Sequence, residues 1–518
     1  MTATTPDRDL PRLMAAYAAV VLLLVLVSAR LWWQSPLHLI QYEFDYFLGL
    51  FASPDPTLFA AWLSIGRRLH LFGFVLVGAL YLVVLKRLLA SPAAMQTRQI
   101  VAWSAVVSLF FAIGMPWVSP DVFFYIGSGW IESHYGLSPY LTPFTSVPGF
   151  AHEQMFANIF PGFLSGVTSY GPLFQKLAAG VAWLSGGNDK AALALYKVLG
   201  LALHAGCSAI VWRLAPADSK RFALFAYAAN PLICFSVLTC AHNDHWMNLF
   251  VLLALLAVTQ RRWSWAGAAL GAAFGFKYFP LVFVPVFGLA ALMQPRADGG
   301  KVSNVFDAVR LAMSFIVAVA LCYLPYPEAL RAFADAAVSG IPVYRNSIYF
   351  FLDVFSAYLG PNLLGTQAFG VSHQGQLGMF LKGAYAVSYA LMLLALSRRL
   401  RSDPLRGVAE GCLVATLLYF ILVNTGNQEW YLTWLIGPAL VLPYARARSL
   451  AWWLSAGFLP LVIFTVKNPM PIWFIANVVL YGLVLVLGGR YLAGLARTTW
   501  SARGLAITSP GAMSDRPG

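Results

Sequence analysis

Apolar stretches separated by short polar turns are the feature that most limits what this chain can fold into. A helix needs about 20 predominantly apolar residues to cross a bilayer. Only 10% of the 518 residues are charged, against about 25% in a typical soluble domain, so lipid must be the main solvent. We therefore expect an all-α polytopic membrane protein with about 12–14 transmembrane helices. The candidate spans lie near residues 11–29, 69–86, 100–118, 191–213, 222–240, 245–260, 263–277, 279–294, 307–326, 376–397, 407–424, 430–445, 449–466 and 471–492.

Basic residues between these stretches predict the topology. With the N-terminus in the cytoplasm, 23 of the 34 basic residues fall in cytoplasmic segments, and 12 of the 20 acidic residues fall outside. This asymmetry obeys the positive-inside rule, and a missed or extra helix would break it further along the chain. We therefore expect both termini in the cytoplasm, one transmembrane domain over residues 1–500, and a disordered cytoplasmic tail over residues 501–518.

Three long segments are expected on the outer side of the membrane. They cover about residues 30–68, 119–190 and 327–375, and the last two are large loops that should contain interfacial helices. The stretch from Pro172 to Gly186 is apolar but too short to cross the bilayer. A crossing there would invert every later loop, so we expect a re-entrant or interfacial segment.

The net charge of +14 does not indicate a nucleic acid partner. The basic residues form short clusters between apolar runs, as topology signals and contacts with lipid head groups do. There is no basic stripe interleaved with aromatic residues, which RNA binding would need. The five cysteines lie inside apolar runs without metal-ligand spacing, which predicts small core residues rather than disulfides or a zinc site. The first apolar run loosely resembles a signal peptide, but the many later spans favour a retained helix.

A carboxylate lies near the start of the second outer segment. Ser119 suits a helix N-cap and Pro120 suits the first turn, so a helix should begin here. Asp121 would then lie in the first turn, where the helix dipole keeps a carboxylate ionised. Helical spacing places Asp121, Tyr125, Ser128 and Glu132 on one face at the membrane surface. An ordinary interfacial amphipathic helix is the competing interpretation.

Two polar hairpins and one lysine fall at the outer ends of later spans. Residues 241–245 read Ala-His-Asn-Asp-His, and four consecutive polar residues are costly at a membrane boundary unless they are used. His242, Asp244 and His245 would also permit a divalent metal, although their spacing does not indicate one. Lys277 either snorkels to the interface or binds a phosphate or carboxylate. The aromatic residues of the hairpin 424–431 either form a belt or stack on a sugar ring.

Together these residues place a carboxylate, cations, histidines and aromatic rings on one side of the membrane. Ion and proton transporters instead bury ionisable groups near the midplane, in broken helices. Mid-helix charges are almost absent here. Further cations expected outside are Arg331, Arg345, His373 and Lys467.

The order of these motifs resembles a known family. The motifs that carry the resemblance are Pro120-Asp121-Val122 with Tyr125, Gly129, Gly136-Leu137-Ser138-Pro139-Tyr140, Tyr170-Gly171-Pro172-Leu173, His242-Asn243-Asp244, Lys277-Tyr278 with Pro280, and Gln428 with Trp430-Tyr431. Through these motifs the chain is similar, over roughly residues 115 to 435, to bacterial GT-C glycosyltransferases that use polyprenyl-phosphate mannose as donor.

The resemblance implies a GT-C-like fold and an inverting sugar transfer at the outer face of a bacterial inner membrane. It implies a lipid-linked sugar phosphate as donor, a glycan or glycolipid as acceptor, and membrane lipid as surroundings. By position Asp121 is the catalytic base. The substrate-binding residues that we expect are Tyr125, Glu132, Tyr140, Tyr170, His242, Asn243, Asp244, Lys277, Tyr278, Gln428, Glu429, Trp430 and Tyr431.

Two positions depart from the family pattern, and two other carboxylates compete with Asp121. Ser138 stands where the family usually has asparagine, and Glu429 where it often has proline, which affects the choice of sugar or acceptor. Glu43 and Asp45, in the first outer segment, are the rival candidates for the base. Lys277 and His242 are expected to act as cations that neutralise the leaving phosphate.

Two other function classes fit the composition. A transporter or flippase for lipid-linked glycans would need substrate-binding groups on both faces, and the short cytoplasmic loops count against it. A glycan polymerase or ligase with a diphosphate-linked donor usually needs a cationic cluster in a large outer loop, which Arg331, Arg345 and His373 would supply.

Overall fold

The structure is a computed structural model of the whole chain. It describes residues 9–34, 56–91, 94–116, 119–294, 301–339, 347–349, 351, 371–465 and 478–495. Over these residues the chain forms helices and short turns, without β-strands. The predicted all-α polytopic class is therefore confirmed.

Helices long and apolar enough to cross a membrane recur along the described chain. Eight qualify by length and composition: Leu10–Ser28, Leu69–Ala90, Asp189–Leu214, Ala217–Thr239, Asn304–Tyr323, Gly378–Ser402, Pro404–Leu422 and Val478–Leu495. Three apolar helices are shorter: Thr97–Ile113, Asp244–Thr259 and Phe279–Met293. All of them fall on predicted spans, so the chain is a multi-pass membrane protein. Several predicted spans are helices too short to cross about 30 Å of hydrocarbon alone.

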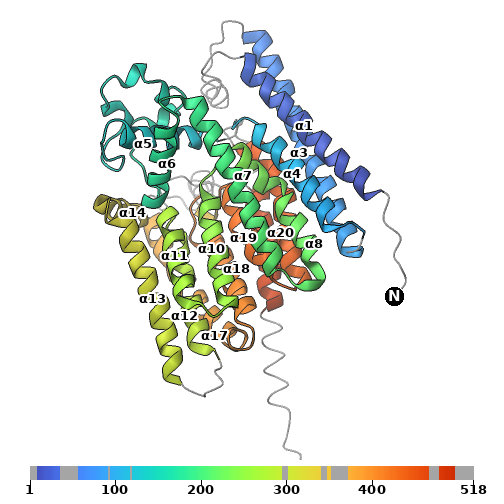
Figure 1. Cartoon of the computed structure of the whole chain (residues 1–518), viewed down its shortest axis with the longest axis vertical. Helices are drawn as coiled ribbons and strands as arrows, with labels where there is room; N and C mark the ends of the chain where they lie inside the picture. Colours follow the sequence, from blue (N-terminus) through green and yellow to red (C-terminus); the bar gives the residue numbers. More distant parts are fainter. Residues whose placement is uncertain are drawn as a thin grey trace, which may run out of the picture.

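The helices form a bundle with a distinct outer layer at one end (Figure 1). On one flank lie α1 (Leu10–Gln34), α3 (Pro56–Ala90) and α4 (Thr97–Ile113), and on the opposite flank α11 (Trp263–Phe276), α12 (Val284–Met293) and α13 (Lys301–Tyr323). Between them lie α7 (Asp189–Leu214), α8 (Lys220–Ala228), α10 (Asp244–Thr259), α18 (Pro404–Leu422), α19 (Thr433–Val441) and α20 (Ala445–Thr465). Two further helices are α14 (Pro327–Ser339) and α17 (Val371–Ser402).

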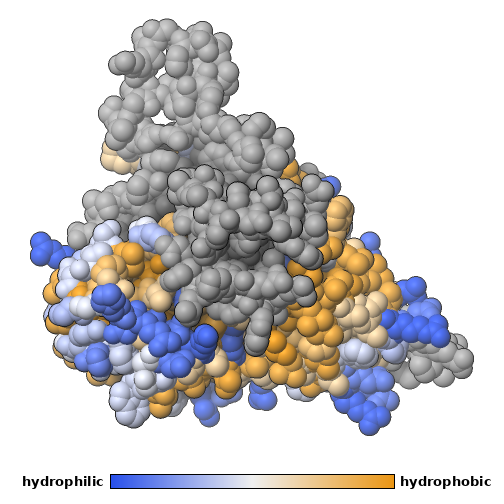
Figure 2. Space-filling view, turned by 90° about the horizontal axis from the view of Figure 1, so that it is seen from above, coloured by the Kyte–Doolittle hydropathy of each residue, from blue (hydrophilic) through white to orange (hydrophobic). Residues whose placement is uncertain are grey.

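The outer flank of the bundle is apolar, as lipid contact requires. Exposed apolar side chains line α13, among them Phe306, Met313 and Ile316, and α17, among them Phe380 and Leu391. Viewed from above, large areas of the described surface are hydrophobic (Figure 2). With no water in the bilayer core, such side chains are stable only against lipid or another apolar surface.

Helix α11 packs closely on α13 through small residues. A Cβ added at Gly271 would lie 2.6 Å from the Cβ of Ala318 and 2.8 Å from the carbonyl oxygen of Phe315. Glycine lets the two backbones approach at this position, as is common where helices pack in membranes. This contact holds α11, whose C-terminal end leads into Lys277, at a fixed place in the bundle.

Helices α5 (Asp121–Ser133) and α6 (Pro172–Leu184) form the outer layer, together with short turns between them. The stretch predicted to be re-entrant or interfacial is therefore a helix, α6, about 20 Å long, which packs on α5. The interpretation of α5 as an ordinary interfacial helix is wrong. Most of its residues are buried, Tyr125 and Ser128 included, because α6, α7 and the turns cover it.

Candidate active site

The backbone around residue 240 is unusual and presents a polar hairpin to the site. Residues Cys234–Thr239 form a π-helical turn, a rare form that often occurs at functional sites. Ala241 follows with φ of 54°, a left-handed conformation that costs free energy for a residue with a side chain. The strained turn places His242 and Asn243 immediately before α10, which begins at Asp244.

Asp121 is the first residue of α5, as predicted, although the cap differs from the prediction. The N-cap position is Pro120 and has no side-chain cap. Ser119 Oγ instead accepts a long hydrogen bond of 3.5 Å from the Asp121 amide. The helix therefore begins one residue later than a serine cap would require, and the Asp121 carboxylate faces His242, which lies just before α10.

Asp121 lies against the first histidine of the hairpin. Its Oδ2 is 3.7 Å from His242 Nδ1 and accepts a hydrogen bond of 3.4 Å from the Tyr170 hydroxyl. The imidazole of His242 stacks on Trp430, with ring centroids 3.7 Å apart and planes 22° apart. Segments far apart in the sequence thus meet at one carboxylate, and the predicted convergence of these motifs is present in the structure.

A second carboxylate holds the lysine. Asp244 Oδ1 accepts hydrogen bonds of 2.7 Å from Lys277 Nζ and of 2.7 Å from Trp434 Nε1. The ammonium also lies 4.5 Å from the ring centroid of Tyr431 and 5.3 Å from that of Trp434, which are cation–π distances. Lys277 is therefore fixed by a carboxylate and two aromatic faces and does not snorkel freely.

Several buried polar atoms of this cluster have no hydrogen-bond partner in the described structure. They are both ring nitrogens of His242, both amide atoms of Asn243, Oδ2 of Asp244 and the hydroxyl of Tyr125. Buried polar groups in native proteins are nearly always paired, and exceptions concentrate where a ligand or water binds. The pattern is typical of a polar ligand site rather than of a hairpin that only turns the chain.

Burial sets the protonation of the two facing groups. It raises the pKa of Asp121 to about 6, against the opposing effects of the Ser119 hydrogen bond and the Lys277 charge. Desolvation therefore outweighs the helix dipole, which by itself would favour the ionised form. Burial, with the nearby Lys277 charge, lowers the pKa of His242 well below its usual value. The lowered pKa favours a neutral imidazole, against the prediction that His242 acts as a cation.

Tyrosines of the outer layer support the Asp121 side of the site. Tyr125 meets Tyr170 edge to face at 4.9 Å, and the Tyr140 hydroxyl donates to the Tyr170 carbonyl at 2.7 Å. The Tyr278 hydroxyl donates to the carbonyl of Ser169. These contacts join the outer layer, which holds Tyr125, Tyr140 and Tyr170, to the segment after α11, which holds Lys277 and Tyr278.

The Tyr170-Gly171-Pro172 motif has a packing reason. The Gly171 amide donates to the Phe276 carbonyl at 3.3 Å, and a Cβ on Gly171 would lie 2.2 Å from the Gly275 carbonyl oxygen. Pro172 then begins α6, a position that proline suits. Glycine is needed because two backbones touch here, and this contact brings Tyr170 close to the Lys277 segment.

Glu132 is not brought to the site. It lies eleven residues after Asp121 on α5, about 16 Å along the helix axis. Its carboxylate accepts from Lys176 Nζ at 2.5 Å and from Gln175 Nε2 at 3.4 Å. Ser138, one of the departures from the family pattern, donates to Glu328 in the same outer region. These groups form a separate polar cluster at the far end of α5.

The hairpin before α19 contributes aromatic rings to the site. Trp430 stacks on His242 and Tyr431 lies under Lys277, so both rings are used within the protein rather than as a membrane belt. Glu429 is buried beside them, and Gln428 immediately precedes the short helical turn Glu429–Leu432. Trp434 was not predicted, although its spacing of four residues after Trp430 is the helical signal that would have found it.

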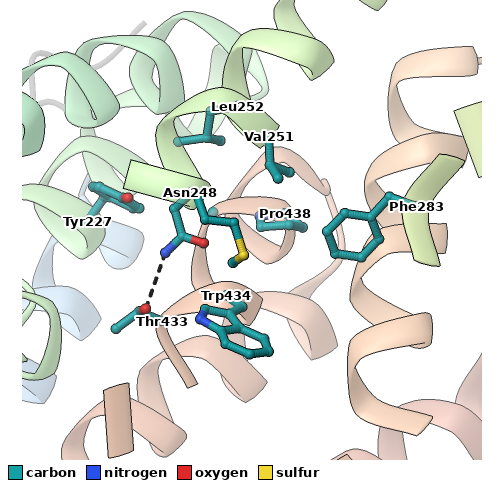
Figure 3. Close-up of a pocket in the computed structure, with 10 residues that line it drawn as sticks. Tyr227, Asn248, Val251, Leu252, Phe283, Thr433, Trp434 and Pro438 are labelled. Atoms are coloured by element: carbon teal, nitrogen blue, oxygen red, sulfur yellow. Dashed lines mark hydrogen bonds between the residues drawn. The ribbon is translucent and has the colours of Figure 1, made fainter. Parts of the chain in front are cut away.

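A small apolar pocket lies on the bundle side of this cluster, between α10 and α19 (Figure 3). Asn248, one turn after Asp244, donates there to Thr433 Oγ1 at 3.2 Å. Trp434 lines the pocket while its indole N–H faces Asp244. Apolar surroundings of low dielectric strengthen the Lys277–Asp244 interaction. The lining residues are Tyr227, Met247, Asn248, Val251, Leu252, Phe283, Thr433, Trp434, Gly437 and Pro438.

The two hairpin histidines do not converge on one point. His245 turns toward the Tyr227 hydroxyl, 3.3 Å from its Nε2, whereas His242 faces Asp121. Over the described residues, no three His, Cys, Asp or Glu side chains are close enough to hold a metal ion.

Arg331 is exposed on α14. Glu43, Asp45, Arg345 and Lys467, and the side chain of His373, lie outside what the structure describes.

Comparison with known proteins finds sequence similarity to mannosyltransferases. Residues 49–293 match the family described as alpha-(1->6)-mannopyranosyltransferase, N-terminal domain. The alpha-(1->6)-mannopyranosyltransferase of Mycobacterium tuberculosis is 26% identical over 386 residues, which cover 63% of this chain and 62% of that protein. GPI mannosyltransferase 1 of Trypanosoma brucei brucei is 25% identical over 298 residues, which cover 54% of this chain and 63% of that protein.

The chain thus spans less than two-thirds of the length of either relative. The family match includes Asp121, Tyr170, the hairpin 242–244 and Lys277, and it ends before the hairpin that holds Trp430. The predicted resemblance to GT-C mannosyltransferases is confirmed, and residues 49–293 are similar to the N-terminal domain of the alpha-(1->6)-mannopyranosyltransferase family.

Proposed function

We propose that this protein is an inverting mannosyltransferase that takes mannose from a polyprenyl-phosphate donor and transfers it to a glycan or glycolipid on the outer face of the membrane. The observation that carries the proposal is the buried cluster in which Asp121 faces His242 while Lys277 is held beside it by Asp244. The two mannosyltransferases that resemble the chain support the choice of sugar.

Asp121 would act as the general base. It takes the proton from an acceptor hydroxyl as that oxygen attacks the anomeric carbon of the donor. The bond between this carbon and the phosphate oxygen breaks on the opposite side, and the electron pair leaves with the polyprenyl phosphate. A β-linked donor then gives an α-linked product. One base is enough, because a phosphate leaving group needs little help from an acid.

Lys277 would stabilise the charge that develops on the phosphate. Of its three N–H donors, one is used by Asp244 in the described structure, which leaves two for phosphate oxygens. The ammonium is partly exposed, at 17% of its side chain, so an anion can reach it. Fixed donors aimed at developing charge are a large part of catalysis, because they need no reorganisation during the reaction.

His242 and Asn243 would complete the site with neutral hydrogen bonds. Their side-chain nitrogens and the Asn243 oxygen are buried and have no partners over the described residues. A neutral imidazole and an amide suit sugar hydroxyls, which both donate and accept. A site that pairs buried groups with substrate hydroxyls rejects sugars that lack them.

The charge pattern of the loops supports an outward-facing site. Asp121, His242 and Lys277 lie in connections that the positive-inside rule assigns to the outer face. Nucleotide sugars stay in the cytoplasm, so an outward-facing transferase needs a donor that has crossed on a lipid. A polyprenyl phosphate meets this need, with its chain in the bilayer and its phosphate at the interface.

Purified protein in detergent, given an acceptor glycan and either polyprenyl-phosphate mannose or GDP-mannose, tests the proposal. We expect transfer from the lipid donor and none from the nucleotide sugar, because Lys277 supplies one cation for a single leaving phosphate beside the membrane. Transfer from GDP-mannose alone would refute the proposed donor. Movement of lipid-linked glycan across vesicles without transfer in detergent would instead establish a flippase.

Transfer is expected to depend on pH through Asp121. The base must be ionised, and burial raises its pKa to about 6, so kcat/KM should rise with pH through a midpoint at about 6 and level off above it. An ordinary aspartate would put this midpoint near 4. Initial rates from pH 4.5 to 8 at low donor concentration measure it, since kcat/KM reports groups of the free enzyme. A midpoint near 4, or no acid limb, would argue against Asp121 as the base.

A further inference from the structure

A buried lysine lies directly behind the candidate site. Lys197, two turns into α7, is 9% exposed. Its ammonium donates hydrogen bonds to the backbone carbonyls of Gly114 at 2.7 Å, Leu238 at 2.7 Å and Thr239 at 2.5 Å. An ammonium carries three N–H donors, so these carbonyls occupy all of them.

The three carbonyls lie at the ends of the two segments that lead into the site. Gly114 follows α4 and stands before the connection to Asp121, whereas Leu238 and Thr239 end the π-helical turn before His242. Carbonyls at helix ends lack intrahelical partners and carry partial negative charge. The Thr239 hydroxyl also donates to the Phe111 carbonyl at 2.7 Å. Lys197 therefore ties two helix ends together at the point where each turns toward the site.

If Lys197 served only to pack, a neutral side chain at this position would cost less free energy to bury. Burying an ammonium away from water is expensive, and charged residues within membrane-spanning segments usually serve a function. Within the described structure, Lys197 pairs with carbonyls and with no carboxylate. Its buried ammonium has no donor left for a substrate, which excludes direct phosphate binding.

We propose that Lys197 is a positioning residue that fixes the Asp121 segment relative to the His242–Asp244 hairpin. The inference rests on the proposed function. Asp121 must stay within reach of the acceptor hydroxyl while Lys277, held by Asp244, contacts the phosphate. Loss of the three hydrogen bonds frees two segments at once, and a misplacement of about 1 Å at a reacting centre can reduce a rate by about 100-fold.

The kinetic test compares Lys197→Met with Lys190→Met, which removes an exposed lysine from the same helix. We expect Lys197→Met to lower kcat by about 10- to 100-fold with KM for the donor nearly unchanged, and Lys190→Met to have no effect. Lys197→Arg keeps the charge and should retain more activity than Lys197→Met. If Lys197→Met does not fold, Lys197→Gln supplies two neutral donors for the same comparison.

The Asp121→Asn background separates positioning from general stability. Residues that act through one another give non-additive effects. Once the base is removed, its position no longer matters, so Lys197→Met should cause little further loss of transfer. An equal fold-loss in both backgrounds, together with a lowered unfolding temperature, would show a purely structural role and overturn the proposal.

Hydrogen exchange provides a readout that does not depend on transfer. In Lys197→Met, amides of residues 111–116 and 238–244 should exchange faster than in the wild type, whereas amides of α13 and α17 should not change. Unchanged exchange in both site segments would overturn the proposal. If the wild type transfers no mannose but the exchange result holds, the proposed function fails and the positioning of the two segments by Lys197 stands.

Discussion

Replacing Asp121 with asparagine is expected to lower the turnover of mannose transfer by about 100- to 10,000-fold, the usual contribution of a general base. Asparagine has nearly the same shape but does not take up a proton. It can still accept the hydrogen bond that the Tyr170 hydroxyl now donates to Asp121 Oδ2 at 3.4 Å. Donor binding should therefore survive, and the loss should appear in kcat rather than in KM. Transfer rates and donor binding of purified variants provide the measurement.

The same substitution should not destabilise the protein. Burial raises the pKa of Asp121, so its ionised form is less favourable in the folded state than in the unfolded state, and ionisation costs stability above the unfolded value. Removing that charge should leave the unfolding temperature equal or slightly higher at pH 7. Asp218→Asn, an exposed change in the short turn Ala217–Ser219 between α7 and α8, is the matched control. Full transfer by Asp121→Asn would remove the assignment of the base and leave Glu43 and Asp45 as candidates.

Replacing Lys277 with methionine is expected to cause two separable losses. The first is stability, because Asp244 would keep its buried charge without the ammonium that now lies 2.7 Å from it. Breaking one partner of a buried ion pair typically costs about 3–5 kcal/mol. The second is catalysis, because the leaving phosphate would lose its cation. Thermal unfolding in detergent and transfer kinetics measure the two losses independently.

The double variant Lys277→Met, Asp244→Asn distinguishes them. Asparagine removes the unpaired charge and can still accept a hydrogen bond from the indole N–H of Trp434. Most of the decrease in unfolding temperature should therefore be recovered. Transfer should not return, because the cation for the phosphate is still missing. Recovery of transfer together with stability would mean that Lys277 serves only to neutralise Asp244, and would exclude its role toward the donor.

The sequence predicted the helical architecture well because lipid imposes a simple rule. Every backbone polar group must be paired within a segment, so apolar length alone locates most spans. The predicted spans near 191–213 and 407–424 correspond closely to α7 and α18. The prediction was less successful for α5. Its stripe of polar residues has the same sequence pattern whether that face of the helix is exposed to water or is buried under neighbouring segments.

The members of the site could be predicted, but their pairings could not. Asp121, His242 and Lys277 stood out as polar residues at the outer ends of apolar runs. That Lys277 pairs with Asp244, 33 residues earlier, and that the pKa of His242 is lowered depend on burial and on the distances between separate segments. Lys197 was missed because a single lysine inside an apolar run resembles a snorkelling residue, and the carbonyls it meets have no signature in the sequence.

A structure of the protein bound to a phosphonate analogue of polyprenyl-phosphate mannose tests the central claim most directly. We expect a phosphonate oxygen within about 3.5 Å of Lys277 Nζ, with the anomeric carbon between the phosphonate and the Asp121 carboxylate. The polyprenyl chain should run into the membrane. A phosphonate bound away from Lys277, with Asp121 out of reach of any hydroxyl that could attack the anomeric carbon even through one water, would contradict the proposed site.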